Sequence, residues 1–347
     1  MIQVGVIGAG VSASALTFVL DQHGTDAAVT ILEKSRGVCG RAATRRRGDV
    51  TYDYGANYVT SADDRVTDVL TNDLDTDGLV DVTEPIWTFD RDGTVSEGRT
   101  KNEHKWTFRS GLTQLAKRLL EPTDATVHRG TRVERIERSA DGWRLTDADG
   151  TAWGPFDVLV LNPPAPQTAT LLETADWNAP VRDELAAAAR AVPYRTVWTA
   201  VLGYPFELEV PYYALVNDDK AHEVGWISRE ECKPGHVPDG ESVLVVQANH
   251  EWSTDRYDEP APANVAELAE LTASILGDER LTAPDWTDHQ GWRYALPEAA
   301  VDRGPLVEAE THGLYAVGDW VPGEGRVHAA LRNGLETGTR LANRYRL

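Results

Sequence analysis

Met1-Ile-Gln-Val-Gly-Val-Ile-Gly-Ala-Gly-Val-Ser-Ala13 is the stretch that decides the fold. It predicts a buried strand that runs into a glycine turn and then into a helix. Gly8 permits the tight turn, Gly10 lets backbone approach a pyrophosphate, and Ala13 keeps the helix close to the sheet. The phosphates would bind free N–H groups at the helix N-terminus, where the helix dipole favours negative charge.

A second apolar run, Val29-Thr-Ile-Leu32, follows the helix and ends in Glu33. In dinucleotide-binding folds, an acid about 20 residues beyond the glycine turn accepts hydrogen bonds from a ribose. The strand, the helix and the acid therefore predict dinucleotide binding. The alternative is a glycine turn in an ordinary βαβ unit.

The composition is that of a globular protein, with 41% hydrophobic and 26% charged residues in 347. This length suits two domains, or one domain with a large insertion. No apolar run reaches the roughly 20 residues that cross a bilayer. We expect no membrane partner and, because no secretory signal precedes the first strand, a cytoplasmic location.

The charge pattern excludes one class of partner and suggests an environment. The net charge is −21, which argues against nucleic-acid binding. There are only six lysines, and self-repulsion at this charge is screened by salt. We therefore expect a halophilic source.

The two cysteines, Cys39 and Cys232, are too few for a disulfide framework or a metal cluster. They form no Cys-x-x-Cys motif, which argues against disulfide reductases. No metal site is expected.

The segment from Lys34 to Gly48 carries six cations and no acid in an otherwise acidic chain. This arrangement predicts a local positive region that binds the pyrophosphate and an anionic substrate. A solvated loop is the alternative.

Helices are expected where apolar residues recur at helical spacing. Ser110 is the expected cap of the third. The expected helices are 11–23, 63–72, 110–120, 178–190, 263–276 and 327–345.

Short strands are expected between these helices, and residues 194–247 have a β-rich pattern. Asn162 to Gln167, with three prolines, is expected to end the strand at Val158–Leu161. Strands typical of the first domain thus return late in the chain, after an insertion. The predicted fold class is α/β, a Rossmann-type nucleotide-binding domain with an inserted α+β substrate domain on a mostly antiparallel sheet. We assign 1–75, 107–170 and 285–347 to the first domain, and 76–106 and 171–284 to the second.

Taken together, these motifs resemble the FAD-binding domain of the flavin amine oxidase superfamily and, within it, the renalase-like oxidoreductases. Cys39 stands where the family usually has the first Gly of Gly-Gly-Arg, and Asn57 where renalases commonly have Gln. The motifs that carry the resemblance are Gly8-Ala-Gly10-x-x-Ala13, Glu33-Lys-Ser-Arg36-Gly37-Val-Cys39-Gly40-Arg41-x-Ala-Thr44-Arg45-Arg46, Asp53-Tyr-Gly55-Ala56-Asn57-Tyr58, Pro164-Ala-Pro166-Gln167, Trp292-Arg-Tyr294-Ala295, Gly318-Asp319 and Gly325-Arg326-Val327.

The resemblance implies FAD as the cofactor and a role for each matching residue. The pyrophosphate and adenosine half would contact Gly8, Gly10, Ala13, Glu33, Lys34, Gly40, Arg41 and, through adenine, Val133. The flavin half would contact Gly55, Ala56, Gly318, Arg326 and Val327, and Asp319 would bind the ribityl or pyrophosphate end. The helix after Arg326 would direct its positive end at the flavin's pyrimidine edge. The residues facing the substrate would be Asn57, Tyr58, Trp292 and Tyr294.

Simpler structural roles stay open for several of these residues. Asp319 could be a helix cap, and Tyr58, Trp292 and Tyr294 could be core packing.

A renalase-like enzyme would transfer hydride from a small reduced substrate to flavin N5, with reoxidation by oxygen. The implied substrate is an aberrant dihydronicotinamide, a 2- or 6-dihydro isomer of NAD(P)H. This chemistry needs no strong base, because the ring becomes aromatic as hydride leaves. No second Gly-x-Gly-x-x-Gly unit follows, so the substrate would bind directly against the flavin.

Two alternatives remain. A flavin amine oxidase would usually place a lysine near flavin N5, and only Lys220 and Lys233 follow Lys117. A non-catalytic FAD-binding or redox-sensing protein would use Cys39, for which a buried structural role is the simpler interpretation. The run Arg45 to Arg47 would suit the extra phosphate of an NADP form.

Overall fold

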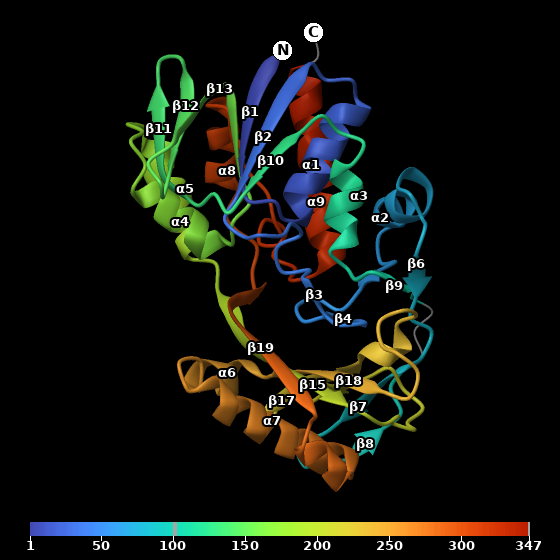
Figure 1. The fold of residues 1–347 in the computed structure, drawn as a ribbon. Helices are drawn as coiled ribbons and strands as arrows, with labels where there is room; N and C mark the ends of the chain where they lie inside the picture. Colours follow the sequence, from blue (N-terminus) through green and yellow to red (C-terminus); the bar gives the residue numbers. More distant parts are fainter. Residues whose placement is uncertain (100–102, 346–347) are drawn as a thin grey trace.

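The computed structural model describes residues 1–99 and 103–345. The opening stretch forms the centre of a five-stranded parallel sheet, with Val4 and Val6 fully buried. Two strands lie on each side of this central strand. All neighbouring strands are parallel, so the carboxyl ends of all five face the same way (Figure 1). The strand order is β10 (Thr126–Arg129), β2 (Ala27–Glu33), β1 (Ile2–Ile7), β14 (Val158–Leu161) and β20 (Leu314–Ala316).

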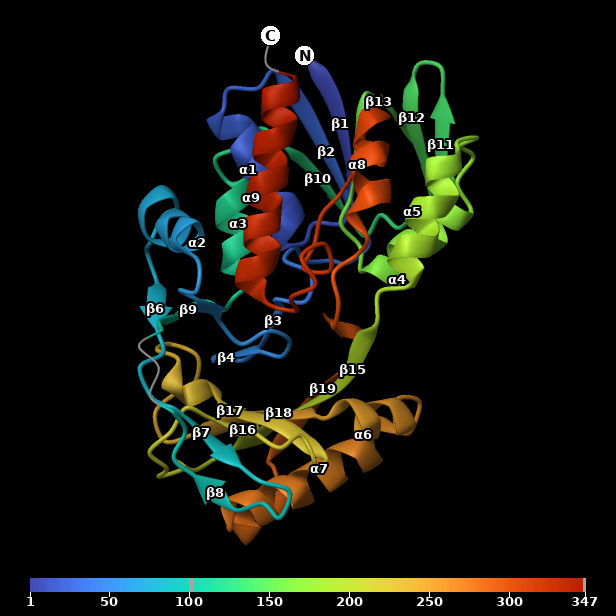
Figure 2. The same ribbon diagram turned by 180° about the vertical axis from the view of Figure 1, so that it is seen from behind.

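Both faces of this sheet are covered. Helices α1 (Val11–Gln22), α3 (Gln114–Leu120) and α9 (Val327–Arg344) pack on one face around a common core. The other face packs against a small antiparallel sheet and three helices (Figures 1 and 2). These are β11 (Val133–Ser139), β12 (Gly142–Asp147), β13 (Ala152–Phe156), α4 (Ala165–Glu173), α5 (Pro180–Arg190) and α8 (Arg303–Thr311).

A second large sheet lies beyond the carboxyl ends of the parallel strands (Figure 1). It has seven strands, all paired antiparallel except β16 with β7. Helices α6 (His250–Asp255) and α7 (Ala261–Leu276) pack on its outer face. The strand order is β19 (Trp286–Pro297), β15 (Tyr194–Tyr204), β18 (Ser242–Ala248), β17 (Val224–Arg229), β16 (Ala214–Asn217), β7 (Ile86–Phe89) and β8 (Val95–Ser96).

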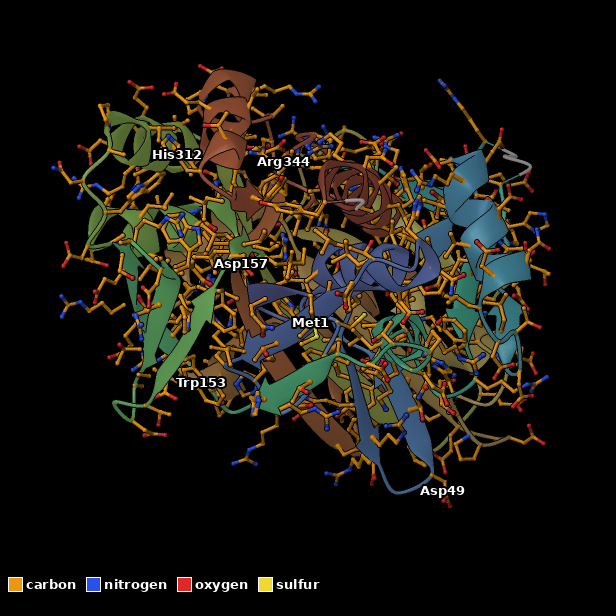
Figure 3. The ribbon with its side chains drawn as sticks, turned by 90° about the horizontal axis from the view of Figure 1, so that it is seen from above. Met1, Asp49, Trp153, Asp157, His312 and Arg344 are labelled. Atoms are coloured by element: carbon orange, nitrogen blue, oxygen red, sulfur yellow. The ribbon has the colours of Figure 1, made fainter. Side chains whose placement is uncertain are left out.

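Smaller elements fill the space between the two sheets. The hairpin of β3 (Thr44–Arg47) and β4 (Val50–Asp53) lies there, and β15 and β19 run from one layer to the other (Figure 2). Asp49, in the hairpin turn, lies at the edge of the molecule when it is seen from the end that carries both termini (Figure 3). The remaining elements are β5 (Val59–Thr60), β6 (Leu79–Asp81), β9 (Lys105–Phe108), α2 (Asp64–Asp68), a π-helical turn (Val69–Asp73) and two 3₁₀ turns (Glu230–Cys232 and Glu279–Thr282).

The predicted fold class is confirmed: a parallel Rossmann-type sheet accompanies a mostly antiparallel second sheet. In the described part of the chain, no helix combines the length and the apolar character that crossing a membrane would require.

The prediction for the third helix was wrong at its start. Ser110 does not cap it, because the left-handed Gly111, with φ of 87°, turns the chain first. The N-cap is Thr113, without a side-chain cap bond. The predicted end of the strand Val158–Leu161 is confirmed. Helix α4 was not predicted: it begins at Ala165 with Pro166 in its first turn, where a missing N–H costs nothing.

The structure also departs from the predicted domain boundaries. Strand β19 belongs to the seven-stranded sheet, although 285–347 was assigned to the nucleotide-binding domain. Helix α5 packs in the core of the parallel sheet, although 171–284 was assigned to the substrate domain. Chain order alone does not reveal which layer a crossing segment joins. The division into two domains otherwise stays a proposal.

Candidate cofactor and active site

The glycine turn lies at the carboxyl end of β1, where the parallel sheet faces the second sheet. Gly8 has φ of 93°, a conformation that L side chains rarely adopt. The Gly10 amide donates to Asn162 Oδ1 at 2.9 Å, and a Cβ on Gly10 would lie 2.5 Å from that oxygen. Ala13 is fully buried in the first turns of α1. The turn therefore has the close backbone approach that a pyrophosphate cradle requires.

Glu33 is held against this turn at the end of β2. Its Oε2 accepts from the Ala9 amide and its Oε1 from the Ser35 amide, both at 2.7 Å. The carboxylate is 7% exposed. Each oxygen keeps a lone pair for a further donor, so the geometry suits a ribose hydroxyl as well as the turn itself.

Two helices direct their N-termini toward the space between the sheets (Figure 1). Gly10 is the N-cap of α1 and Arg326 that of α9, with Val327 as the first helical residue. Among the described residues, neither cap residue has a side chain that accepts a bond from a helix N–H, and neither first turn carries an acid. Their free N–H groups therefore suit an anion or the electron-rich edge of a ring.

The side chains of Asp319 and Arg41 form an ion pair with each other. Arg41 Nη2 donates to Asp319 Oδ1 at 2.7 Å, and Nη1 donates to the carbonyls of Tyr294 and Ala295 at 3.2 and 2.8 Å. Burial would lower the pKa of Arg41, but the Asp319 carboxylate outweighs it and raises that pKa. Because the Asp319 side chain pairs with Arg41, the simple helix-cap role does not describe it. Neighbouring Gly318 has φ of 145° and donates to Asn333 Oδ1.

Four of the other five cations of the segment 34–48 also have partners. Lys34 Nζ donates to Gln167 Oε1 at 3.2 Å, and Arg45 pairs with Asp288 at 2.8 Å. Arg46 donates to the Ser110 carbonyl, and the Arg47 guanidinium lies 5.2 Å from the Trp286 ring centroid. These contacts organise the hairpin and its junction with β19, and anion binding by the segment stays a prediction.

The segment 53–57 runs from β4 between the two layers. The Ala56 amide donates to the Arg41 carbonyl at 3.0 Å, and a Cβ on Gly55 would lie 2.0 Å from that oxygen. Asn57 Oδ1 accepts from Ser228 Oγ at 2.9 Å. Gly40 has φ of 60° and lies over Gly10: a Cβ added to Gly40 would lie 3.6 Å from the Gly10 Cα. Glycine at 55 thus lets the Arg41 backbone approach this segment closely.

The four residues predicted to face substrate fall into separate contact groups. Tyr58 packs against Tyr213 and Trp226, with centroids 6.2 and 6.4 Å away. Trp292 stacks on Tyr54 at 5.5 Å. Asn57 lies against β17, as above. Burial raises the pKa of Tyr58, with Arg326 opposing it, so its hydroxyl stays protonated.

Tyr294 and Val133 have different contacts from these three residues. Tyr294 packs edge-on against Tyr194 at 5.7 Å, and its carbonyl binds Arg41. Val133 opens β11, is 7% exposed, and pairs with Asp147. Tyr58, Trp292 and Tyr294 are therefore half-buried side chains that pack against other aromatic rings, and their contact with a substrate stays a prediction.

Cys39 occupies a position that suits glycine. Its φ is 82°, and its amide donates to the Ala9 carbonyl at 2.8 Å. The side chain is 2% exposed, and burial raises the pKa of the thiol to about 12. A protonated, buried thiol is a poor nucleophile and a poor redox sensor.

The structure reveals a buried charged cluster that the sequence analysis missed. Lys233 Nζ lies 3.0 Å from Asp53 Oδ2 and 2.8 Å from Glu230 Oε1, and His236 Nδ1 lies 2.9 Å from Glu230 Oε2. All four side chains are fully buried. The scarcity of lysine was the one available signal, because 180 residues separate Asp53 from Lys233.

Comparison with known families identifies two matching regions. The profile of the NAD(P)-binding Rossmann-like domain matches residues 6–72. The profile of the flavin-containing amine oxidoreductases matches residues 93–342, most of the chain.

Solved structures share the fold at low sequence identity. A protein from Exiguobacterium sp. 255-15, assigned as a protoporphyrinogen oxidase, superposes with a TM-score of 0.78 at 13% identity, over 99% of each chain. Reduced UDP-galactopyranose mutase gives 0.76 at 12%, over 99% of this chain and 96% of the other. Cyclohexylamine oxidase from Brevibacterium oxydans gives 0.73 at 13%, over 99% of each. These similarities establish the architecture and leave the substrate open.

Proposed function

The chain belongs to the flavin-containing amine oxidoreductase family, and we propose that it oxidises a small dihydronicotinamide in the manner of renalases. It is an oxidoreductase with FAD as its cofactor. When bound, FAD would supply the hydride acceptor, and oxygen would restore its oxidised form while being reduced to hydrogen peroxide. The substrate class proposed is a 2- or 6-dihydro isomer of NAD(P)H.

The residues at the carboxyl edge of the parallel sheet fit the cofactor. In our proposal Gly8, Gly10 and the uncapped start of α1 hold the pyrophosphate, and Glu33 holds the adenosine ribose. The Arg41–Asp319 ion pair would border the middle of the cofactor. Lys34, Gly40 and Val133 would border the adenosine half, and Gly318, Arg326 and Val327 the flavin half.

The burial and ion pairing of Lys233 are the observation that favours a dihydronicotinamide over an amine as substrate. An amine oxidase of this superfamily would be expected to place a lysine near flavin N5. Lys233 is fully buried, and its ammonium is bound by two carboxylates. Lys220, the other candidate, lies exposed in the turn after β16. Hydride loss from a dihydronicotinamide needs neither lysine as a base.

Asn57 is proposed to orient the substrate ring. Its Oδ1 accepts from Ser228, which leaves its Nδ2 as a donor for a carboxamide oxygen. Tyr58 and Trp292 would supply half-buried aromatic surface for the substrate ring. Tyr294, whose carbonyl accepts from Arg41, would border the path by which the substrate enters. The positioning of the ring, rather than acid–base chemistry, would then supply the rate enhancement.

Arg45, Arg46 and Arg47 are engaged by other residues, so we propose no dedicated site for the extra phosphate of an NADP form. A halophilic setting stays part of the proposal, on the strength of the net charge of −21. A cytoplasmic location stays a prediction.

Amine oxidation is the second candidate, favoured by the family match across residues 93–342. The FAD-loaded protein should be incubated in air with dihydronicotinamide isomers, with ordinary NADH and NADPH, and with primary and secondary amines. The proposal predicts one oxidised nicotinamide and one peroxide for each dihydronicotinamide consumed. Peroxide and aldehyde from amines alone would instead establish the second candidate.

A further inference from the structure

The segment 53–57 is bonded at nearly every residue to the second sheet or the loop that follows β17. The Asp53 amide donates to Glu230 Oε2 at 2.9 Å, and Trp292 Nε1 donates to the Tyr54 carbonyl at 3.2 Å. Gln247 Nε2 donates to the Gly55 carbonyl at 2.8 Å. Together with the Ser228–Asn57 bond, these contacts mean that the second sheet dictates where the segment lies.

The same segment is bonded to the nucleotide-binding layer. The Tyr54 amide donates to the Ala43 carbonyl at 3.1 Å, and Asp53 Oδ1 accepts from Thr44 Oγ1 at 2.6 Å and from the Leu112 amide at 2.9 Å. The segment is therefore the place at which both layers meet, and its small residues are the ones proposed to face the flavin.

Lys233 supplies the charge that makes this junction stable. Burial would raise the pKa of Asp53, but the Lys233 ammonium and His236 outweigh it and lower that pKa. Burial likewise opposes a charged Lys233, but the carboxylates of Asp53 and Glu230 raise its pKa. Two buried carboxylates without this cation would carry an uncompensated charge.

The cluster has the geometry of a cation site. Among the described residues, one group of three acidic or histidine ligands lies close enough to share an ion: Asp53, Glu230 and His236, with ligand atoms within 4.8 Å of one another. The Lys233 ammonium is bound by both carboxylates of that group.

We propose that Lys233 is a positioning residue, an internal cation that fixes segment 53–57 between the two layers and so sets how Gly55 to Asn57 meet the flavin. The placement of these residues against the flavin rests on the function proposed above. The cation role of Lys233 does not, and it can be tested without FAD.

The first experiment uses the protein without FAD. Lys233→Ala should melt at a lower temperature than the wild type. Co²⁺ alone should bind this variant at one ion per chain, give a visible ligand-field spectrum and raise its melting temperature. Wild type should show none of these Co²⁺ effects. A variant that melts like the wild type and takes up no Co²⁺ would overturn the cation role.

The second experiment uses the FAD-loaded protein and a control matched for stability. Lys233→Ala should change the visible circular dichroism and the midpoint potential of the flavin and lower kcat by about 100-fold. Co²⁺ should restore all three. Leu268→Ala, in the core between α7 and the sheet, should lose stability while keeping the flavin signals of the wild type.

The double variant Lys233→Met with Glu230→Gln keeps the chain testable if Lys233→Ala does not fold, because it removes the cation together with one carboxylate. It should fold and still show the altered flavin signals. Wild-type dichroism and midpoint potential in any folded Lys233 variant would overturn the positioning role. If the protein did not oxidise a dihydronicotinamide, the visible dichroism and the midpoint potential of the flavin could still be measured. A wrong substrate and a wrong role for Lys233 would therefore give different results.

Discussion

Glu33 shows how one side chain serves both the fold and the site. Its two oxygens hold the amides of Ala9 and Ser35, so the acid shapes the glycine turn before any nucleotide binds. In the proposed site, part of the contribution of Glu33 to FAD affinity would therefore come from holding the backbone of the glycine turn in place.

Glu33→Gln should lower the free energy of unfolding by about 1–3 kcal/mol, because an amide NH₂ would face one of the two buried N–H groups. FAD affinity should fall as well. Urea unfolding and calorimetric FAD titration measure the two effects. Glu134→Gln, on an exposed carboxylate of β11 paired with Arg132, is the control and should change neither. Unchanged FAD affinity in Glu33→Gln would contradict the assigned role.

Cys39 predicts a defined pH dependence. Burial raises the pKa of its thiol from 9.0 to about 12, so between these values the unfolded chain releases a proton that the folded chain keeps. Stability is thus fully present below pH 9 and falls as pH rises, by about 1.4 kcal/mol per unit.

Between about pH 8 and about pH 10, the free energy of unfolding should fall in both proteins. The fall should be about 1.4 kcal/mol smaller in Cys39→Ala than in the wild type. Urea unfolding at the two pH values gives the difference, and buried tyrosines cancel because both proteins contain them. Equal losses in the two proteins would mean that the thiol is not buried as described.

At the scale of elements, the pairing of α1 with α9 decides where both uncapped N-termini point. A Cβ on Gly334 would lie 2.2 Å from the Ser12 carbonyl oxygen, so glycine is needed for the close approach of the helices. Ser12 Oγ also donates to the Ala330 carbonyl at 2.7 Å. The first and last helices of the chain therefore form one unit beside the proposed cofactor site.

Gly334→Ala should separate the two helices and cost about 1–3 kcal/mol of stability through overpacking. FAD affinity should fall with it, because both N-termini move. Gly304→Ala in α8 is the matched control, since its Cβ would lie at an ordinary 3.5 Å from Asp302. Thermal melting and FAD titration measure the outcome; a variant that binds FAD like the wild type would separate helix packing from cofactor binding.

The elements were predictable to different degrees, for physical reasons. Local patterns indicated β1, α1, β2 and α9, because glycine spacing and apolar runs act within one segment. Helix α4 was missed because prolines mark both the end of a strand and the first turn of a helix. The Arg45–Asp288 and Arg41–Asp319 pairs were beyond prediction, since each joins segments more than 200 residues apart.

At the scale of the whole molecule, the net charge of −21 predicts a salt dependence. Self-repulsion destabilises the compact state at low ionic strength, and salt screens it. The melting temperature should rise from low salt to molar KCl. An unchanged or falling melting temperature would end the halophilic interpretation.

The two-layer architecture and the cofactor class followed from motifs at both ends of the chain, whereas the junction between the layers did not. The Asp53–Lys233 contact depends on how the seven-stranded sheet folds back over β4, which no local pattern encodes. That junction bears on the substrate question, because it removes Lys233 from the pool of free bases.

The central claim is that the flavin takes hydride from a dihydronicotinamide and not from an amine. Anaerobic mixing of the FAD-loaded protein with each compound, followed by the visible absorption of the flavin, tests it within one turnover. The account predicts rapid bleaching by a 2- or 6-dihydro isomer of NAD(P)H and none by primary or secondary amines. Bleaching by an amine alone, or a protein that takes up no FAD, would contradict it.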